Sequence, residues 1–278
     1  GGTTRALLAE AGALRKAGAS VGFCPVLGAE LGRAARIHPD LAPFVEAGTL
    51  RLLDPRIRQR TRLLVVHQAA ILRHLPAEPP GLRPDRIVLV LHHPPLDGLG
   101  RPAYDLAAAV ANLREAFGAE VALGPVGPMV RAQLGRLPWP GAEALPEDWS
   151  NLLDFEAWPL RAGRPGGSRI VVGRHSRPQP AKFPDTLEDA LLAYPDRPDV
   201  TVRMLGAPED LAATYGRRPG NWELLPFDAE PVPRFLESLD YYVYLHGRAW
   251  VEAFGYSILE AIASGVPAIL PPSFRDTF

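Results

Sequence analysis

The stretch EAFGYSILEAIASGVPAIL, residues 252–270, decides the fold of this chain. Gly255 marks a turn, residues 256–264 predict a short helix, and Gly265 is the expected end of that helix. The Gly-Val-Pro exit at 265–267 leads into a short apolar segment, which predicts a strand. Working outward from this stretch, we find helices and strands in alternation in both halves of the sequence, separated by a segment rich in proline and tryptophan at 137–167 that is expected to connect two domains.

The first turn of the predicted helix offers a binding site for an anion such as a diphosphate. Its backbone N–H groups lack partners within the helix and point out of the helix end. Glu252 precedes the turn, and Glu260 lies one helical turn inside it, about 6 Å further along the axis. One carboxylate can therefore reach a group beyond the phosphate while the other reaches back along the ligand, an arrangement that suits a nucleotide sugar.

A simpler interpretation makes Glu252 an ordinary loop carboxylate and Glu260 part of a solvated helix face. The neighbours of Glu260 argue against it, because they are apolar or small: Ile258, Leu259, Ala261, Ile262 and Ala263. A carboxylate in a largely buried helix needs a partner or a function. We therefore favour the binding interpretation.

The two glutamates, the glycine between them and the Gly-Val-Pro exit resemble the donor-site signature of retaining glycosyltransferases of the GT-B fold, a Glu-x7-Glu motif. The resemblance implies that Glu252 contacts the donor sugar and that Glu260 holds the ribose. It also implies that the backbone of Phe254, Gly255 and Tyr256 faces the sugar and the distal phosphate.

A basic segment, VVGRHSRPQPAK at 171–182, follows the first strand of the second half. Cations at the carboxyl end of a strand are well placed to neutralise a diphosphate. In the family that the chain resembles, an arginine and a lysine here stabilise the departing nucleoside diphosphate. Lys182 matches the lysine. Arg174 and Arg177 are alternatives for the arginine, because the loop is longer than the common family pattern.

Three further positions complete the predicted site. His93, chosen over His92, matches a histidine that contacts the donor sugar in retaining members of the family, although a structural histidine is the alternative. Trp222 opens the segment expected to hold the base, with core packing as the alternative. Gly2 resembles the glycine-rich first loop of the amino-terminal domain. No Asp-x-Asp motif occurs, so we expect neither a metal nor a cofactor beyond the nucleotide-sugar donor.

Composition limits the classes of protein. The 278 residues are 47% hydrophobic and carry a formal net charge of −1, which gives no electrostatic case for binding nucleic acid. The single cysteine, Cys24, excludes an internal disulfide and fits a reducing compartment. We expect a cytoplasmic protein, with peripheral association at the inner membrane face left open. The start at Gly1 and the end at Phe278 suggest a fragment lacking both chain ends.

The alternation predicts an α/β fold of two Rossmann-like, doubly wound domains facing each other across a crevice, as in the GT-B type. Residues 1–160 form the acceptor-side domain and 161–278 an incomplete nucleotide-sugar domain. Helices are expected at 3–17, 30–37, 103–117, 128–135, 186–193, 208–215, 232–239 and 256–264. Strands are expected at 21–26, 49–53, 63–67, 86–92, 120–123, 148–153, 169–173, 200–205, 222–225, 241–245 and 268–270.

The function expected from these features is a retaining, metal-independent transfer of a hexose from a nucleotide-diphosphate sugar to an acceptor hydroxyl on a glycan, a lipid or a small molecule. Two alternatives remain open. One is a nucleotide-sugar epimerase of the same fold, and the other is a fragment that binds the donor without turnover.

Overall fold

The structure, a computed structural model, describes residues 2–24, 41–67, 69–74, 79–137, 141–163 and 166–278. The chain divides into two compact units. Unit 1 comprises residues 1–153 together with 252–254, and unit 2 comprises residues 154–251 together with 255–278. Both units alternate helices with parallel strands, so the predicted α/β class is confirmed.

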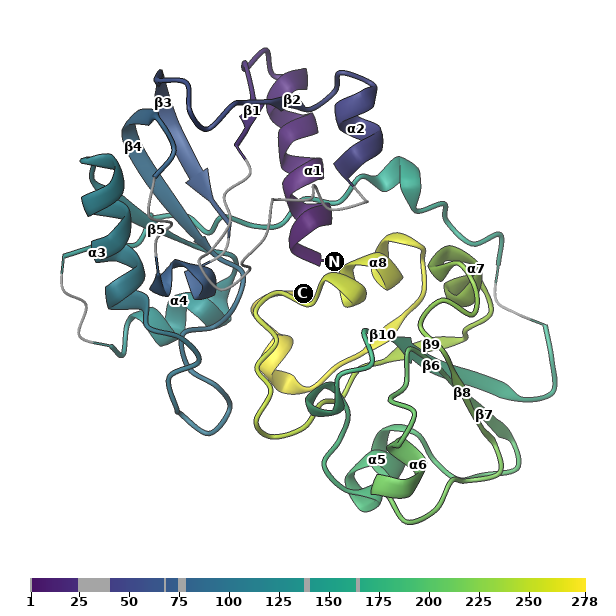
Figure 1. The fold of residues 1–278 in the computed structure, drawn as a ribbon. Coiled ribbons are helices and arrows are strands. Elements are labelled where there is room, and N and C mark those ends of the chain that lie inside the picture. The colour runs from purple at the N-terminus through teal and green to yellow at the C-terminus, as the bar shows by residue number, and fades with distance from the viewer. Residues whose placement is uncertain (1, 25–40, 68, 75–78, 138–140, 164–165) are drawn as a thin grey trace. The chain divides into compact units, whose positions relative to one another are not determined.

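Unit 1 contains two parallel sheets among the residues that the structure describes. The smaller pairs β1 (Gly22–Phe23) with β2 (Arg51–Leu52), and the larger has the order β3-β4-β5 (Figure 1). The strands of the larger sheet span Gln59–Val66, Leu82–Leu91 and Val121–Pro125. The helices of the unit are α1 (Gly2–Lys16), α2 (Ala42–Glu46), the 3-10 turn η3 (Ala69–Arg73), α3 (Leu106–Phe117) and α4 (Pro128–Leu134).

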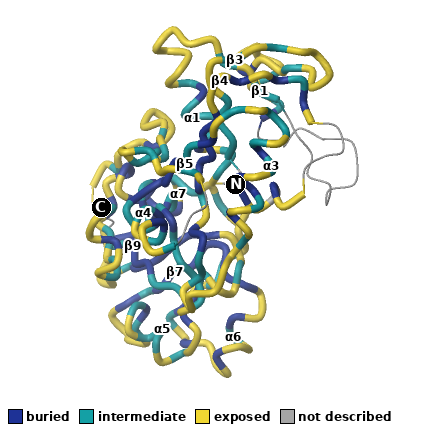
Figure 2. The backbone as a smooth tube through the Cα atoms, turned by 90° about the vertical axis from the view of Figure 1, so that its left-hand side faces the viewer, coloured by how far each residue is buried: buried dark blue, intermediate teal, exposed yellow. Residues whose placement is uncertain are grey.

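The second half of β4 forms the centre of the unit 1 core. Residues 87–91, IVLVL, are all buried, as expected for a parallel strand covered on both faces (Figure 2). Helix α3 packs beside this strand through Ala109, Val110 and Leu113. Asp105 caps its start by accepting the Ala108 N–H, and Gly118 ends it in the left-handed conformation at φ 63°.

Unit 2 is a five-stranded parallel sheet in the order β10-β9-β6-β7-β8. Its strands are β6 (Ile170–His175), β7 (Val200–Leu205), β8 (Trp222–Leu225), β9 (Tyr241–Val243) and β10 (Ala268–Ile269). Helices α5 (Leu187–Ala193) and α6 (Leu211–Thr214) lie on one face, and α7 (Val232–Glu237) and α8 (Tyr256–Ala263) on the other (Figure 1). Short 3-10 turns η4 (Phe155–Ala157), η5 (Pro180–Lys182) and η6 (Pro272–Phe274) complete the unit.

This strand order is that of a doubly wound sheet. The chain starts at the central strand β6, builds outward through β7 and β8, returns to the other side of β6 with β9, and ends at β10. The direction of winding therefore reverses between β6 and β9. In open parallel sheets ligands bind outside the carboxyl ends of the strands at this point of reversal.

Most of the expected elements occur; the exceptions are one strand, two elements that were not expected, and one helix. The segment 148–153 forms no strand: it is irregular, and the Trp149 N–H donates at 2.7 Å to the carbonyl of Pro125, the last residue of β5. Helix α2 and turn η3 had no counterpart in the prediction. The helix expected at 30–37 lies outside the described residues.

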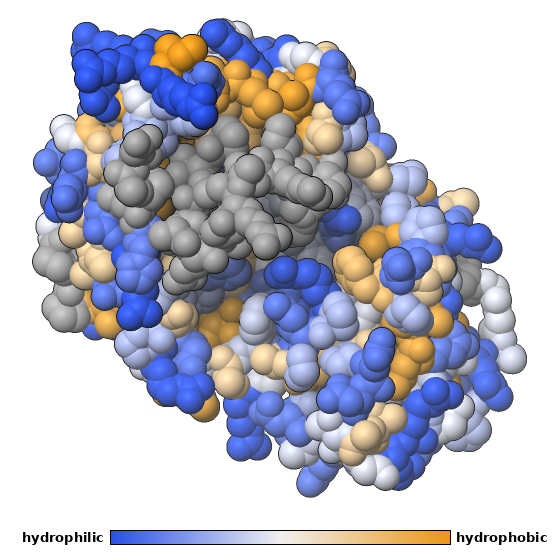
Figure 3. All heavy atoms as spheres, in the orientation of Figure 1, coloured by the Kyte–Doolittle hydropathy of each residue, from blue (hydrophilic) through white to orange (hydrophobic). Residues whose placement is uncertain are grey.

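The face seen in Figure 3 mixes hydrophilic residues with smaller apolar patches. Several large apolar side chains are exposed, including Leu160, Leu192 and Phe155. Within the described ranges, none of the helices is both long enough and apolar enough to cross a membrane.

Candidate functional site

The candidate site of unit 2 lies where β6 and β9 end. Successive side chains of an extended strand point to opposite faces of the sheet, so the side chains of the last two residues of β6 lie on different faces. Arg174 points toward the face covered by α5, where it meets Phe183. His175 points toward α7 and α8, where it meets Phe235 and Glu260.

Glu260 and His175 form a buried pair that joins helix α8 to the end of β6. Glu260 Oε2 lies 2.7 Å from His175 Nε2, and only 2% and 3% of these residues are exposed. Because a carboxylate only accepts, the Nε2–H of His175 is the donor. The bond fixes the first two turns of α8 against the carboxyl end of the central strand. The solvated-face interpretation of Glu260 is therefore wrong, and its partner is a histidine.

Helix α8 begins at a glycine turn. Its N-cap, Gly255, adopts φ 84°, and no side chain caps the first turn. A Cβ at this position would lie 2.8 Å from Cδ1 of Ile258, so both the backbone angle and the packing require glycine. Tyr256, the first residue of the helix, is partly buried. The predicted glycine turn and helix start are confirmed.

Arg174 is a buried structural cation in this structure. Its side chain is fully buried, and the guanidinium carbon lies 4.5 Å from the ring centres of both Phe183 and Tyr244. Its Nη1 donates to the carbonyl of Leu245 at 2.6 Å, which ties the end of β6 to the segment after β9. Burial and the contacts with the two rings leave little of the guanidinium surface accessible to a ligand. Of the two alternatives, Arg177 is the exposed arginine and therefore has the accessible charge.

The loop that carries Lys182 is fastened to the segment that follows β9. The Gly247 N–H donates to Ala181 O at 3.1 Å, and the Arg248 N–H donates to Asp185 Oδ2 at 2.8 Å. Lys182 is partly buried, with its Nζ 4.9 Å from the centre of the Trp250 ring. A cation over an indole face is held in place by its attraction to the ring. The segments that follow β6 and β9 are thus hydrogen-bonded to each other, and Lys182 adds a positive charge to them.

Trp222 and Gly2, which were predicted for the donor site, lie in a core and in a helix instead. Trp222 is 2% exposed in the unit 2 core, where its Nε1 donates to Tyr194 O at 3.1 Å and its ring meets Tyr194 and Tyr215 edge to face. Trp222 is thus a core residue, which was the alternative to a role in holding the base. Gly2 was expected in a loop but begins helix α1, and a Cβ there would meet nothing within 4 Å.

The other predicted residues belong to unit 1. Glu252 and Phe254 are partly buried, and Ala253 between them is buried in the unit 1 core. His93 is exposed, and its carbonyl accepts the hydroxyl of Tyr104 at 2.8 Å. His92 instead lies within the unit, where its Nε2 is 3.0 Å from Nδ1 of His67.

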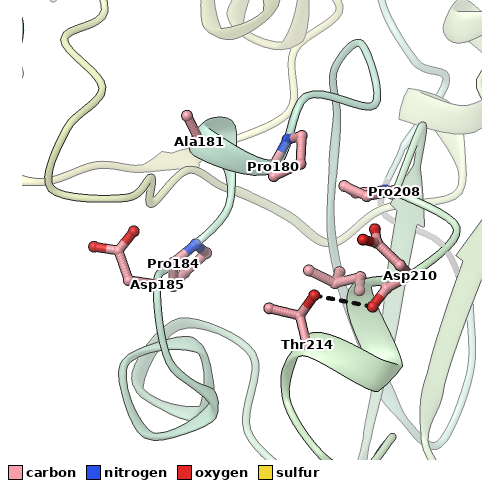
Figure 4. A pocket seen from close by; sticks show the side chains of 8 residues that line it. Pro180, Ala181, Pro184, Asp185, Pro208, Asp210 and Thr214 are labelled. Carbon is pink, nitrogen blue, oxygen red and sulfur yellow. Dashed lines mark hydrogen bonds between the residues drawn. The ribbon is translucent and has the colours of Figure 1, made fainter.

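A cavity of about 160 Å³ also opens between the segments that follow β6 and β7 (Figure 4). Its wall is mostly apolar, with Pro180, Pro184 and Pro208 facing Asp185 and Asp210. Neither Lys182 nor Trp222 lines this cavity. Over the described part of the chain, no group of three or more His, Cys, Asp or Glu side chains is arranged to hold a metal ion.

The sequence analysis did not identify three buried or partly buried polar residues near the strand ends: His175, Glu10 and His67. His175 stands beside Arg174 in the basic segment, and strand alternation could have placed it on the α8 face. Glu10 and His67 carry no local signal, because their neighbours come from distant parts of the sequence: Trp149 donates to Glu10, and His67 meets His92.

The comparisons with known proteins give distant structural likenesses. No family of known proteins matches the chain, and no curated protein does. A crystal structure of TarM superposes with a TM-score of 0.49 at 16% identity, over 75% of this chain and 40% of that chain. An S. aureus TarM mutant in complex with fondaparinux, alpha-GlcNAc-glycerol and UDP gives 0.42 at 16% identity, over 68% and 37%.

The crystal structure of the glycosyltransferase SnogD from Streptomyces nogalater gives a TM-score of 0.34 at 17% identity, over 97% of this chain and 78% of that chain. This chain therefore spans about 40% of the length of the TarM chains that it matches. These likenesses are too distant to place the chain in a family.

Proposed function

We propose that the chain binds a nucleoside diphosphate sugar through unit 2 and transfers its hexose to an acceptor hydroxyl. The observation that carries this proposal is the bond between Glu260 and His175, which brings the open start of α8 to the end of β6 at the point where the sheet reverses its winding. A helix start at that point suits a diphosphate.

In this proposal the diphosphate lies between the first turn of α8 and the cations of the β6 loop. Transfer of the sugar leaves a negative charge on the departing nucleoside diphosphate, and preorganised positive groups lower the barrier by stabilising that charge. Lys182 supplies one such group, and Arg177 another. Arg174 acts indirectly, because its bond to Leu245 holds the β9 segment in place.

Glu260 and Glu252 have separate roles in this proposal. Glu260 is held at the end of β6 by its bond to His175, and in this proposal its carboxylate accepts a ribose hydroxyl. Glu252 accepts hydroxyls of the donor sugar, as its spacing from Glu260 suggests. Retention of the anomeric configuration and independence from metal ions belong to the same proposal, since Arg177 and Lys182 take the place of a cation.

A nucleotide-sugar epimerase would use the same donor site, and so would a fragment that binds the donor without turnover. The three cases differ in their products. A transferase releases free nucleoside diphosphate only when an acceptor is present, whereas an epimerase interconverts the sugars without one. Donor binding with neither product would indicate an inactive fragment.

A thermal-shift screen against UDP-, GDP-, ADP- and dTDP-sugars tests the proposal. A ligand that binds only the folded chain stabilises it by about 2.7 kcal/mol when present at about 100 times its Kd. We expect one nucleotide class to raise the Tm, and Glu260→Gln to reduce that rise. The matched control is Glu237→Gln, because Glu237 is an exposed helix residue of the same unit. A Tm that stays at the value of the ligand-free chain with all four classes would contradict the proposal.

A further inference from the structure

Unit 1 has a surface rich in arginine at the amino ends of β3 and β4. Residues 51–86 contain eight arginines, no lysine and three acidic residues, whereas the whole chain carries a formal net charge of −1. Positive charge is therefore concentrated in this stretch, and the rest of the chain is net negative. Six exposed arginines of the two strands and of the turn before β3 make up what we call the arginine surface: Arg56, Arg58, Arg60, Arg62, Arg83 and Arg86.

The pairing of β3 with β4 brings these arginines together. The two strands run parallel with Arg60 opposite Arg83, and β5 pairs with β4 only from Ile87 onward. The amino halves of β3 and β4 therefore form a two-stranded ribbon that extends past the end of β5 (Figure 1). The turn before β3 is joined to the start of β4, because the Gly81 N–H donates to Pro55 O at 2.7 Å. The arginines of that turn thus lie at the end of the same ribbon.

Little of the charge on the arginine surface is neutralised within unit 1. Arg60 Nη2 donates to Asp85 Oδ1 at 2.9 Å, but these side chains are 81% and 43% exposed, and an ion pair that exposed to water is weak. Among the residues that the structure describes, no ion pair joins Arg58, Arg62 or Arg86 to an acidic side chain. These guanidinium groups are therefore accessible to an anionic partner.

Protection of the sheet edge explains only part of the arginine surface. Charged residues on an outer strand stop other chains from pairing with it. Arg60 and Arg62 fit that role, because β3 is an outer strand of the described sheet. Arg83 and Arg86 do not fit it, because β4 lies between β3 and β5 in the strand order. The surface thus carries more positive charge than edge protection requires.

Exposed apolar side chains lie among the arginines. Ile57 stands between Arg56 and Arg58 and is 54% exposed. Leu63 of β3 lies opposite Arg86 and is 43% exposed. Apolar side chains flanked by cations suit the boundary between lipid headgroups and acyl chains, where the apolar groups leave water and the cations meet phosphates. Arginine suits this role because its fork of N–H donors binds two phosphate oxygens at once.

We propose that the arginine surface binds an anionic lipid bilayer, with its guanidinium groups on the headgroup phosphates and Ile57 inserted among the headgroups. Binding of this kind requires no sugar donor, so it stands apart from the proposed function. Single-stranded nucleic acid fits the surface less well, because proteins that bind it stack its bases on aromatic side chains. No Phe, Trp or Tyr occurs between Phe44 and Tyr104.

Co-sedimentation of the chain with lipid vesicles tests this inference. One set of vesicles contains phosphatidylcholine alone, and the other an equal mixture of phosphatidylcholine and phosphatidylglycerol. We expect the chain to bind the mixed vesicles and not the neutral ones. Binding should weaken as the salt concentration rises from about 0.05 M to about 0.5 M, because salt screens the attraction. Equal binding to both kinds of vesicle, or binding to neither, would overturn the inference.

Two triple variants separate the arginine surface from the net charge of the chain. The first replaces three of its exposed arginines: Arg58→Gln, Arg62→Gln and Arg86→Gln. The control removes the same charge from exposed positions of unit 2: Arg169→Gln, Arg218→Gln and Arg275→Gln. Each basic residue at an anionic surface strengthens binding about fivefold, so we expect the first variant to lose on the order of a hundredfold in affinity and the control less than about fivefold. Equal losses would overturn the inference.

A change at Ile57 separates a bilayer from a soluble polyanion. Ile57→Asn keeps every charge but removes the apolar side chain, so we expect binding to the mixed vesicles to weaken about tenfold. Ile269→Asn is the matched control, because Ile269 lies in unit 2 and is 53% exposed, and it should bind as the wild type does. Wild-type binding by Ile57→Asn, or tighter binding of the wild type to single-stranded DNA than to the mixed vesicles, would overturn the assignment to lipid.

Discussion

The two units bury histidines at the ends of their parallel strands in different ways. In unit 2, His175 meets a carboxylate, that of Glu260, at 2.7 Å. In unit 1, His92 meets a second imidazole, that of His67, at 3.0 Å. A carboxylate partner only accepts hydrogen bonds, whereas a neutral imidazole partner donates through one ring nitrogen and accepts through the other. The partner therefore decides which chemistry each strand end can perform.

The two strand ends also differ in the groups that surround them. The end of β6 in unit 2 holds a carboxylate, a lysine and an open helix start, which suit the ribose and the phosphates of a donor. The ends of β3 and β4 in unit 1 hold the neutral imidazole pair of His67 and His92.

The largest effect is expected from Glu260→Ala in unit 2. The change leaves His175 buried without its acceptor and opens a cavity beneath α8, so we expect a loss of about 3 kcal/mol in the free energy of unfolding. Urea unfolding of unit 2 measures it. Glu237→Ala, an exposed control, should change the same quantity by less than about 0.5 kcal/mol. Equal losses in the two variants would show that the His175 bond contributes nothing.

The next largest effect is a pH dependence of unit 1. The folded pKa values of His67 and His92, about 4 and about 3, lie below the ordinary value of 6.5. Below pH 6.5 the unfolded chain therefore binds protons that the folded chain does not. Stability is full above pH 6.5 and falls by about 1.4 kcal/mol per pH unit for each histidine as the pH drops toward those values. Glu10, whose pKa is raised, works in the opposite direction.

Amide hydrogen exchange of β4, recorded between about pH 7 and about pH 5, measures this slope once the rates are corrected for the pH dependence of intrinsic exchange. His92→Gln should reduce the slope by one histidine's share, whereas His74→Gln, a change at an exposed histidine, should leave it as it is. A slope that is the same in the wild type and in His92→Gln would contradict the neutral pair.

A smaller effect is expected from Gly255→Ala at the start of α8. The residue has φ 84°, and its new Cβ would press on Ile258, so we expect a loss of about 1–2 kcal/mol. Two controls divide this loss. Gly216→Ala has a similar φ of 71° but open space, and Gly220→Ala has open space and no such angle. The losses, measured by urea unfolding, should decrease in that order, and any other order would show that packing at Ile258 is not limiting.

The smallest effect on stability is expected from Lys182→Ala. Losing the contact with Trp250 should cost about 0.5–1 kcal/mol in the free energy of unfolding, while turnover of the sugar donor falls much more. Lys16→Ala is the natural control, since Lys16 is the other lysine of the chain and is exposed in unit 1. Thermal unfolding and kinetics on the same samples separate the two quantities. Unchanged turnover in Lys182→Ala would remove Lys182 from the proposed site.

The sequence predicted unit 2 better than unit 1 for a physical reason. In unit 2 glycines and apolar runs mark the ends of the elements, so β7 and β8 agree with the prediction at both ends. The burial of Glu260 followed from its apolar neighbours in the sequence. Arg174 shows the limit of such reasoning, because two rings from distant loops bury it.

In unit 1 the decisive contacts join segments that are far apart along the chain. Trp149 meets Glu10 across 139 positions, and the strand expected around Trp149 is an irregular segment that bonds to Pro125. His92 and His93 are adjacent in sequence, so no local pattern could tell that the first would pair with His67 and the second would be exposed.

The central claim is that unit 2 binds a nucleoside diphosphate at the start of α8, and backbone amide NMR during a titration with UDP, GDP, ADP and dTDP tests it most directly. The account predicts that one of these nucleotides shifts the amides of Gly255, Tyr256 and Ser257 together with those of the loop from Arg177 to Lys182. Shifts confined to other parts of the chain, or none with any of the four, would contradict it.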